Sequence, residues 1–307
     1  MSRIRSLVLT LAVLCVLPWL LPNNFLLDIA VRIALTSIAV IGLNFLMGFA
    51  GQISIGHAAF VALGAYGSGI LISRWDWPVI PTALVVCLVV SALAWLIAKP
   101  FLRLKGHSLT MATLGMGVIV NMVLINEVNW TGGPDGMPVP PLVIGSFAVT
   151  KIIHWYALAA ACLWLCCLLS VNLFDSPAGR ALRGLHGSEI AARVVGVDVS
   201  AFKVRAFVCA SAFATFSGVL NGHYLGFISP ALSSFTHSVE LTTMVVLGGM
   251  SSTYGVVLGA ALLTMLPQLV GGLNGYEAVL FGLVLMLTMI FLPRGILPSL
   301  ALLLKRA

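Results

Sequence analysis

The sequence has few charged residues. Only 8% of its 307 residues are Asp, Glu, Lys or Arg, whereas 60% are hydrophobic and the mean hydropathy is +1.11. Soluble domains carry about 25% charged residues, so this scarcity excludes an ordinary soluble domain. Apolar runs of roughly 17 to 25 residues suffice to cross a bilayer as a helix, and the sequence contains many such runs. The composition therefore predicts an all-α, polytopic integral membrane protein built as a single helix bundle over residues 1–307.

The sequence also lacks the motifs that carry nucleotide or hydrolytic chemistry. It has no Gly-x-x-x-x-Gly-Lys-Ser/Thr loop to hold nucleotide phosphates, no His-Glu-x-x-His and no Gly-x-Ser-x-Gly. No pair of acidic residues lies within an apolar run, as a proton relay would need. We therefore expect a protein that is not an enzyme, with no catalytic residues and no cofactor.

Cysteine is scarce and confined to the apolar runs. None of the six cysteines lies in an external loop, which argues against a disulfide framework. Cys162 and Cys166 stand one helical turn apart, but no histidine or acidic residue accompanies them. We expect no metal site, and we interpret the thiols as small core side chains.

Hydropathy predicts ten membrane spans. The third contains many glycines and the eighth is short and opens with Glu240, so either of these two is expected to be re-entrant or broken. The expected spans are 6–22, 29–49, 52–73, 79–98, 108–126, 152–172, 204–222, 237–249, 255–271 and 277–293. The first span follows Arg3 and Arg5 as a signal peptide would, but no small-x-small cleavage site follows it. We expect this span to be retained.

The net charge of +7 is explained by topology rather than by nucleic-acid binding. With ten spans and the N-terminus inside, 13 of the 16 basic residues fall on the cytoplasmic side, all but Arg32, Arg74 and Lys151. Cytoplasmic loops of membrane proteins carry such an excess of Lys and Arg. The sequence thus predicts N-in and C-in orientation and no nucleic-acid partner.

A glycine-rich stretch inside the membrane points to transport. Residues 44–69 contain six glycines together with Asn44, Gln52, Ser54 and His57. Broken backbone at membrane depth is tolerated only where protein or a water-filled path satisfies its amide groups. The mild polarity fits a neutral or zwitterionic solute, whose path is predicted to be lined by Asn44, Gln52, Ser54, His57, Thr113, Asn121 and Thr242. The alternative for each side chain is an ordinary hydrogen bond between helices.

Two hydrophilic segments lie on opposite sides of the membrane by the charge count. Residues 127–151 are dense in turn formers and are expected to be an ordered external loop, either a connector or a rim that receives a ligand. Residues 173–203 are expected to form two short cytoplasmic helices. The first begins at the N-cap Ser176, the second runs from Ser188 to Val195, and Asp198 or Ser200 caps the following span.

The two cytoplasmic helices carry apolar residues interleaved with arginines. A protein partner would bury this stripe, and the alternative is a helix lying on anionic headgroups. Because the spans lack the acidic residues that ion-driven carriers place at the midplane, the driving force must come from elsewhere. The pattern favours a permease driven by separate ATP-hydrolysing subunits, over a carrier that works alone or a non-transporting scaffold.

Several motifs in order resemble a known family, the LivM-like permease subunits of branched-chain amino acid ABC importers. The resemblance covers residues 29–295. Its motifs are Gly-Phe-Ala-Gly-Gln-Ile-Ser-Ile-Gly-His-Ala-Ala-Phe at 48–60, Thr-Gly-Gly-Pro-Asp-Gly at 131–136, Ser-Pro-Ala-Gly-Arg-Ala-Leu-Arg at 176–183, Ala-Ala-Arg-Val-Val-Gly-Val at 191–197, Val-Leu-Gly-Gly-Met at 246–250 and Leu-Pro-Arg-Gly at 292–295.

The resemblance implies a bacterial inner-membrane importer with several subunits. Its expected partners are a sister permease, two cytoplasmic ATP-binding subunits, a periplasmic solute-binding protein and membrane lipid. Some relatives carry urea, short amides or sugars instead. The residues expected to couple to the ATPase are Arg180, Arg183, Glu189, Ala191, Ala192, Arg193 and Gly196. ABC importers often carry Glu-Ala-Ala-x-x-x-Gly at this place, whereas here Glu189 stands one position early.

Overall fold

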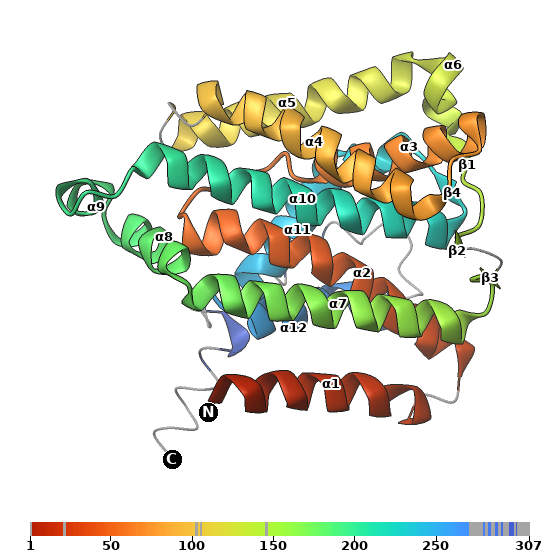
Figure 1. Ribbon diagram of the computed structural model, residues 1–307, viewed down its shortest axis with the longest axis horizontal. Helices are drawn as coiled ribbons and strands as arrows, with labels where there is room; N and C mark the ends of the chain where they lie inside the picture. The colour runs from red at the N-terminus through yellow and green to blue at the C-terminus, as the bar shows by residue number, and fades with distance from the viewer. Residues whose placement is uncertain are drawn as a thin grey trace.

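The computed structural model describes residues 2–20, 23–101, 104, 106–144 and 147–269, with a few further positions between 279 and 299. The longer helices are α1 (Ser2–Leu20), α2 (Asn24–Asn44), α3 (Ala58–Trp75), α4 (Val79–Phe101), α5 (His107–Asn126), α7 (Ile152–Asp175), α10 (Val199–Leu225), α11 (Phe235–Gly248) and α12 (Thr253–Leu269). They lie side by side, roughly along one direction (Figure 1).

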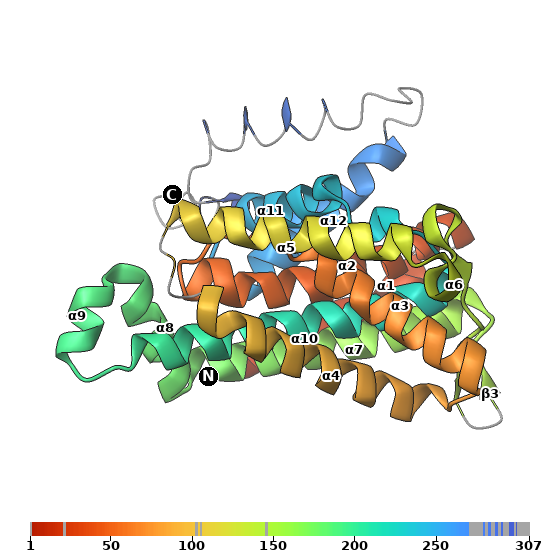
Figure 2. The same cartoon turned by 90° about the horizontal axis from the view of Figure 1, so that it is seen from above.

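Shorter elements gather at the two ends of this bundle. Helices α8 (Pro177–Gly187) and α9 (Glu189–Val194) project beyond one end in both views, and we call this the α8–α9 end (Figures 1 and 2). The other end carries α6 (Val128–Thr131), the 3₁₀ turn η2 (Gly133–Asp135) and strands β1 (Met137–Pro138), β2 (Val143–Ile144), β3 (Phe147–Ala148) and β4 (Phe227–Ile228). We call this the strand end.

The described helices match most of the predicted spans. Five of them are long and apolar enough to cross a membrane, and two shorter apolar helices cover Arg5–Leu20 and Thr253–Gln268. These seven correspond to the predicted spans other than the third, the eighth and the tenth. Most of the tenth, 277–293, falls outside the described residues. The chain is a multi-pass, all-α membrane protein.

Helix α2 forms the centre of the bundle. It packs against α7, α10, α11 and α12. From Val31 to Asn44 all of its residues are buried except Arg32, Ile33 and Thr36. A helix that is apolar all round is expected to be enclosed by protein or lipid. The close approach of α10 uses Gly42, because a Cβ there would lie 2.5 Å from the Cβ of Phe213.

The strand end is ordered by pairing between distant segments. Strand β1 pairs antiparallel with β4, so that Met137 lies opposite Ile228. Gly136 makes the turn with a φ of 74°, and a Cβ on it would lie 2.2 Å from the carbonyl oxygen of Ile228. The pairing of β1 with β4 thus fixes this part of the predicted loop against the chain that follows α10.

The sequence predicted a break in the third or the eighth span, and the structure shows non-helical chain within the third and before the eighth. Helix α3 begins only at Ala58, although the third span was predicted from residue 52, so 50–57 is non-helical. Helix α11 has only 14 residues and follows a stretch made of β4 and the 3₁₀ turn η3 (Pro230–Ser233). The third span is broken, and the eighth is preceded by non-helical chain at the strand end.

Candidate functional site: the broken third span and the α8–α9 hairpin

The helix that begins as α2 ends in a turn that is not α-helical. Its last turn, η1 (Phe45–Phe49), is a π-helix, a form that is rare and is frequent at functional sites. Asn44 Oδ1 accepts a hydrogen bond from Ser251 N at 3.0 Å, and the Ser251 hydroxyl donates to the Gly48 carbonyl. Only glycine fits at position 48, because a Cβ would lie 2.1 Å from Asn44 Oδ1 and 2.4 Å from Ser251 N.

Residues 50–57, which we call the broken segment, have backbone groups that bond side chains of α5 and α11. Thr113 Oγ1 of α5 accepts from Ile55 N at 3.3 Å, and Thr110 Oγ1 donates to Ile53 O at 3.4 Å. Thr242 Oγ1 of α11 donates to Ser54 O at 3.4 Å. The imidazole of His57 bonds the Ala210 carbonyl of α10 at 3.1 Å. This is the condition under which broken backbone is stable at membrane depth.

Several polar atoms around the broken segment have no hydrogen-bond partner among the described residues. They are Asn44 Nδ2, Gln52 Oε1, Ser54 Oγ and His57 Nδ1, and all four side chains are at most 5% exposed. A buried polar group without a partner costs about 1–3 kcal/mol. Such groups favour a conformation, or an occupant of the site, that gives them partners.

The structure brings together five of the seven side chains predicted to line a path. Gln52, Ser54, His57, Thr113 and Thr242 lie on the broken segment or bond to it. Asn44 lies just before the segment, where it bonds Ser251. Asn121 lies apart from them. Its Nδ2 donates to Pro230 O at 2.9 Å and to Ser233 Oγ at 2.8 Å, so it holds the 3₁₀ turn η3 that precedes α11.

Sequence reasoning missed the serines that complete this arrangement. Ser251 binds the end of α2, and Ser238 Oγ accepts from Ala58 N at 3.3 Å at the start of α3. Isolated serines in apolar spans give no sequence signal of their own, because their partners are backbone atoms about 180 or more residues away.

The α8–α9 hairpin forms as its capping residues predict. Ser176 accepts from Gly179 N at 3.2 Å, Ser188 accepts from Ala191 N at 3.2 Å, and Asp198 accepts from Ala201 N at 3.1 Å. Asp198, rather than Ser200, therefore caps α10. The turn out of α9 uses Gly196, whose φ of 82° favours glycine.

Helix α9 presents an uncovered apolar face. Ile190, Val194 and Val195 are 78%, 83% and 77% exposed, whereas Ala192 is buried against the bundle. Ala191, Arg193 and Gly196 are also exposed. Exposed apolar patches of this kind mark interaction sites. Of the predicted coupling residues, Arg180 and Arg183 on α8 are exposed as well.

The hairpin touches the broken span directly. Arg183 stacks over the Phe174 ring at 4.2 Å, and Phe174 packs edge-on against Phe49, the last residue of the π-helix, with centroids 4.5 Å apart. A Cβ on Gly51 would lie 3.1 Å from the ring of His186 at the end of α8. A displacement of α8 would therefore reach the broken segment through side-chain contact.

A second contact joins α9 to α10. Glu189 forms an ion pair with Lys203, whose side chain is 5% exposed. Both residues line a cavity of about 210 Å³ together with Gly51, Gln52 and Thr110. Glu189, which stands one position early in the coupling motif, is thus bonded inward and is not part of the exposed face of α9.

An apolar helix bundle with a broken span and a projecting hairpin in contact with it has the architecture of a membrane permease. Residues 25–293 match the family described as "Branched-chain amino acid transport system / permease component". The chain belongs to this family.

Named relatives agree with that assignment. The chain is 33% identical to the high-affinity branched-chain amino acid transport system permease protein LivM of Escherichia coli K12 and to LivM of Salmonella typhimurium LT2, over 88% of this chain and 69% of each relative. It is 25% identical to LivH of Escherichia coli K12, over 85% of this chain and 90% of the relative. No solved structure matches the chain.

Proposed function

We propose that this chain is the membrane-spanning subunit of an ATP-driven importer for branched-chain amino acids in the bacterial inner membrane. The observation that carries the proposal is the family match over 25–293, together with relatives whose names specify branched-chain amino acid transport. The chain is similar to both LivM and LivH, which supports a complex with a sister permease. Two ATP-binding subunits and a periplasmic solute-binding protein complete the importer, with ATP hydrolysed on the separate subunits.

We propose ten crossings with both termini in the cytoplasm and with the α8–α9 end on that side. The start of α1 lies at this end (Figure 1). Tyr254, in the first turn of α12, bonds Ser6 of α1, so α12 also begins there. The excess of Lys and Arg at this end supports the orientation. A tenth span after α12 returns the chain to the cytoplasm.

We propose that the exposed face of α9 docks on an ATP-binding subunit. Ile190, Val194 and Val195 supply the apolar contact, and the arginines of α8 and α9 frame it. This position, beyond the end of the bundle and in contact with the broken span, suits a part that transmits motion. The coupling residues are Arg180, Arg183, Ala191, Arg193 and Gly196 at the surface, with Ala192 and Glu189 holding the hairpin inward.

We propose that the broken segment opens and closes the solute path. In the described conformation its backbone bonds α5 and α11 and the His57 imidazole bonds α10, and these contacts close the way through the bundle. When the hairpin moves, Gln52, Ser54 and His57 exchange these contacts for water or for the polar head of the solute. Their neutral side chains suit a zwitterion, with Asn44, Thr113, Asn121 and Thr242 alongside.

The proposal is tested by uptake into proteoliposomes that hold the permease with its partner subunits. Leucine accumulation is expected to require ATP and the binding protein and to be inhibited by isoleucine and valine. Accumulation of leucine after the ATP-binding subunits are omitted would instead identify a carrier that works alone. Accumulation of urea or a sugar, but not of leucine, would overturn the solute class.

Docking is tested separately by crosslinking. In a cysteine-depleted background, Val194→Cys is expected to crosslink to an ATP-binding subunit. Lys151→Cys, exposed at the strand end, serves as the matched control and is expected not to do so. Absence of crosslinking at Val194 in a transport-competent complex would contradict the docking proposal.

A further inference from the structure

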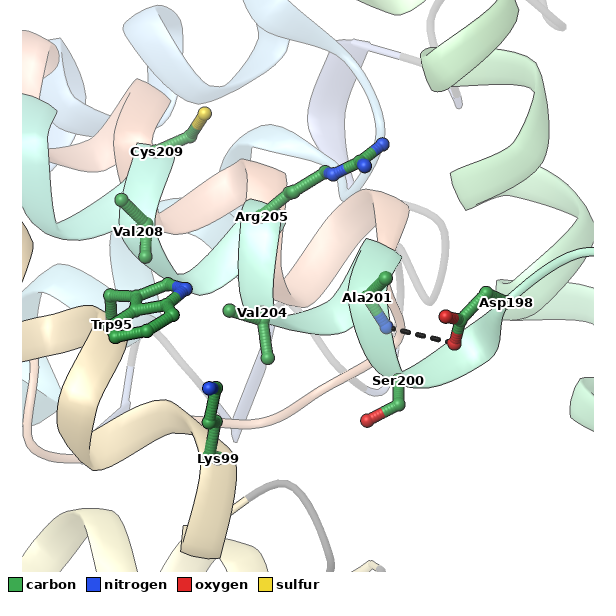
Figure 3. Close-up of a pocket in the computed structure, with 9 residues that line it drawn as sticks. All are labelled: Trp95, Lys99, Asp198, Ser200, Ala201, Val204, Arg205, Val208 and Cys209. Carbon is green, nitrogen blue, oxygen red and sulfur yellow. Dashed lines mark hydrogen bonds between the residues drawn. The ribbon is translucent and has the colours of Figure 1, made fainter.

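A groove lies between the last turns of α4 and the first turns of α10, outside the features described so far. Its volume is about 640 Å³. Trp95 and Lys99 project from α4 toward Val204 and Val208 of α10, as Figure 3 shows. Lys99 stands two residues before the end of α4, and Arg205 is the seventh residue of α10. At 1.5 Å per residue, both cations lie within about two turns of the α8–α9 end.

Two cations of the groove have no acidic partner. Lys99 Nζ sits 4.0 Å from the centroid of the Trp95 ring, and Arg205 lies over Phe202 at 5.2 Å. Neither forms an ion pair within the part of the chain that the structure describes. The one carboxylate in the groove, Asp198, accepts a hydrogen bond from Ala201 N and caps α10 (Figure 3). The groove therefore offers positive charge to an occupant.

The rest of the groove is apolar and continues onto the outer face of α4. Val204 and Val208 form its inner wall. Beyond Trp95, itself 48% exposed, the outward side chains of α4 are large and uncovered, with Leu84, Leu88 and Leu96 at 61%, 70% and 64% exposure. A molecule with an anionic head and an apolar tail matches this sequence of surfaces. Trp and Lys at a helix end are also typical of the membrane interface.

The same face is poorly suited to a partner helix. Helices that pack together in membranes present small residues to each other. On α4 the small residues Ala94 and Ala98 are fully buried inside this chain, and the outward face consists of large side chains. A protein partner would also have to desolvate the unpaired Lys99 and Arg205, which is costly unless it supplies acidic groups.

We infer that this groove binds one anionic phospholipid of the leaflet at the α8–α9 end. Its phosphate lies at the Lys99 ammonium, with the Ser200 hydroxyl within the same groove, and an acyl chain runs along Val208 and the outer face of α4. The Arg205 guanidinium points away from Lys99, across α10, and adds positive charge at the same end of the bundle (Figure 3). Basic pockets between membrane helices recognise such headgroups. The inference goes beyond the proposed function, because lipid binding is measured without transport.

The experiment uses the full-length permease purified in detergent with its partner subunits. Phosphatidylglycerol and phosphatidylcholine are added in turn, and bound lipid is counted by native mass spectrometry while Tm is recorded. The variant is Lys99→Gln with Arg205→Gln. The control is Arg74→Gln, which removes a cation stacked on Trp130 at 4.5 Å at the strand end.

Wild type and the Arg74→Gln control are expected to retain phosphatidylglycerol in preference to phosphatidylcholine and to gain Tm from it. The double variant is expected to bind phosphatidylglycerol at least about tenfold more weakly, since each interfacial cation contributes to the attraction. Equal retention of the two lipids by wild type, or unchanged selectivity in the double variant, would overturn the inference. So would a double variant that loses its sister permease while keeping its lipid selectivity, because the groove would then be a protein interface.

Discussion

Glu189 of α9 forms an ion pair with Lys203 of α10, and this pair ties the projecting hairpin to the bundle. Lys203 is almost completely buried, whereas the Glu189 side chain is 36% exposed. Removing the acid would leave a buried ammonium unpaired, while replacing both residues by neutral ones would not. The pair therefore gives a direct test of how firmly the hairpin is attached.

We expect Glu189→Gln to lower the thermal stability of the permease complex. A fully buried pair costs about 3–5 kcal/mol when one partner is removed, and partial exposure reduces this to about 1–3 kcal/mol. The double variant Glu189→Gln with Lys203→Met should recover most of the loss, because no unpaired charge remains. The measurement is thermal unfolding of the purified complex. Equal loss in the single and double variants would show that the ion pair does not hold the hairpin.

Gly48→Ala is expected to disrupt the π-helical turn that ends α2. The new Cβ would meet Asn44 Oδ1 and Ser251 N at 2.1 and 2.4 Å, and overpacking of this kind costs typically about 1–3 kcal/mol. The matched control is Gly115→Ala in α5, where nothing lies within 4 Å of the new Cβ. Thermal stability and leucine uptake should both fall for the first variant and stay unchanged for the second. A Gly48→Ala protein of normal stability would show that the turn can rearrange.

Thr113→Val removes the hydroxyl that accepts a hydrogen bond from the amide of Ile55 in the broken segment. A buried amide left without a partner costs about 1–3 kcal/mol, so the segment should loosen. Faster hydrogen exchange of residues 50–57 is the expected result. Thr243→Val is the control, since among the described residues the Thr243 hydroxyl bonds only Val239 O of its own helix. Identical exchange in both variants would contradict the assigned role of Thr113.

Phe174→Ala is expected to separate ATP hydrolysis from uptake. The ring of Phe174 lies between Arg183 on the hairpin and Phe49 just before the broken segment. Removal of the ring therefore interrupts the contact through which motion of the hairpin would reach the broken segment. The ratio of leucine accumulated to ATP hydrolysed should fall, and Phe174→Leu should restore part of it. Phe25→Ala, at an exposed position of the strand end, is the control. A wild-type ratio in Phe174→Ala would exclude this route.

Local signals in the sequence determined the class of the protein and the position of its irregular parts. Runs of apolar residues define the spans, because a bilayer needs a set length of helix. The glycines of 44–69 predicted the break, and Ser176, Ser188 and Asp198 predicted the hairpin, because a cap bonds an amide only two or three residues ahead.

Only the tertiary structure decided which distant groups meet. The membrane helices are apolar on all sides, so hydropathy does not say which face of α5, α10 or α11 approaches the broken segment. Thr113 joined the segment and Asn121 did not, although both lie on the same helix. In the same way Ala191 is exposed and its neighbour Ala192 is buried. These outcomes depend on how the helices pack, and packing is set by side chains that are far apart in the sequence rather than by any local pattern.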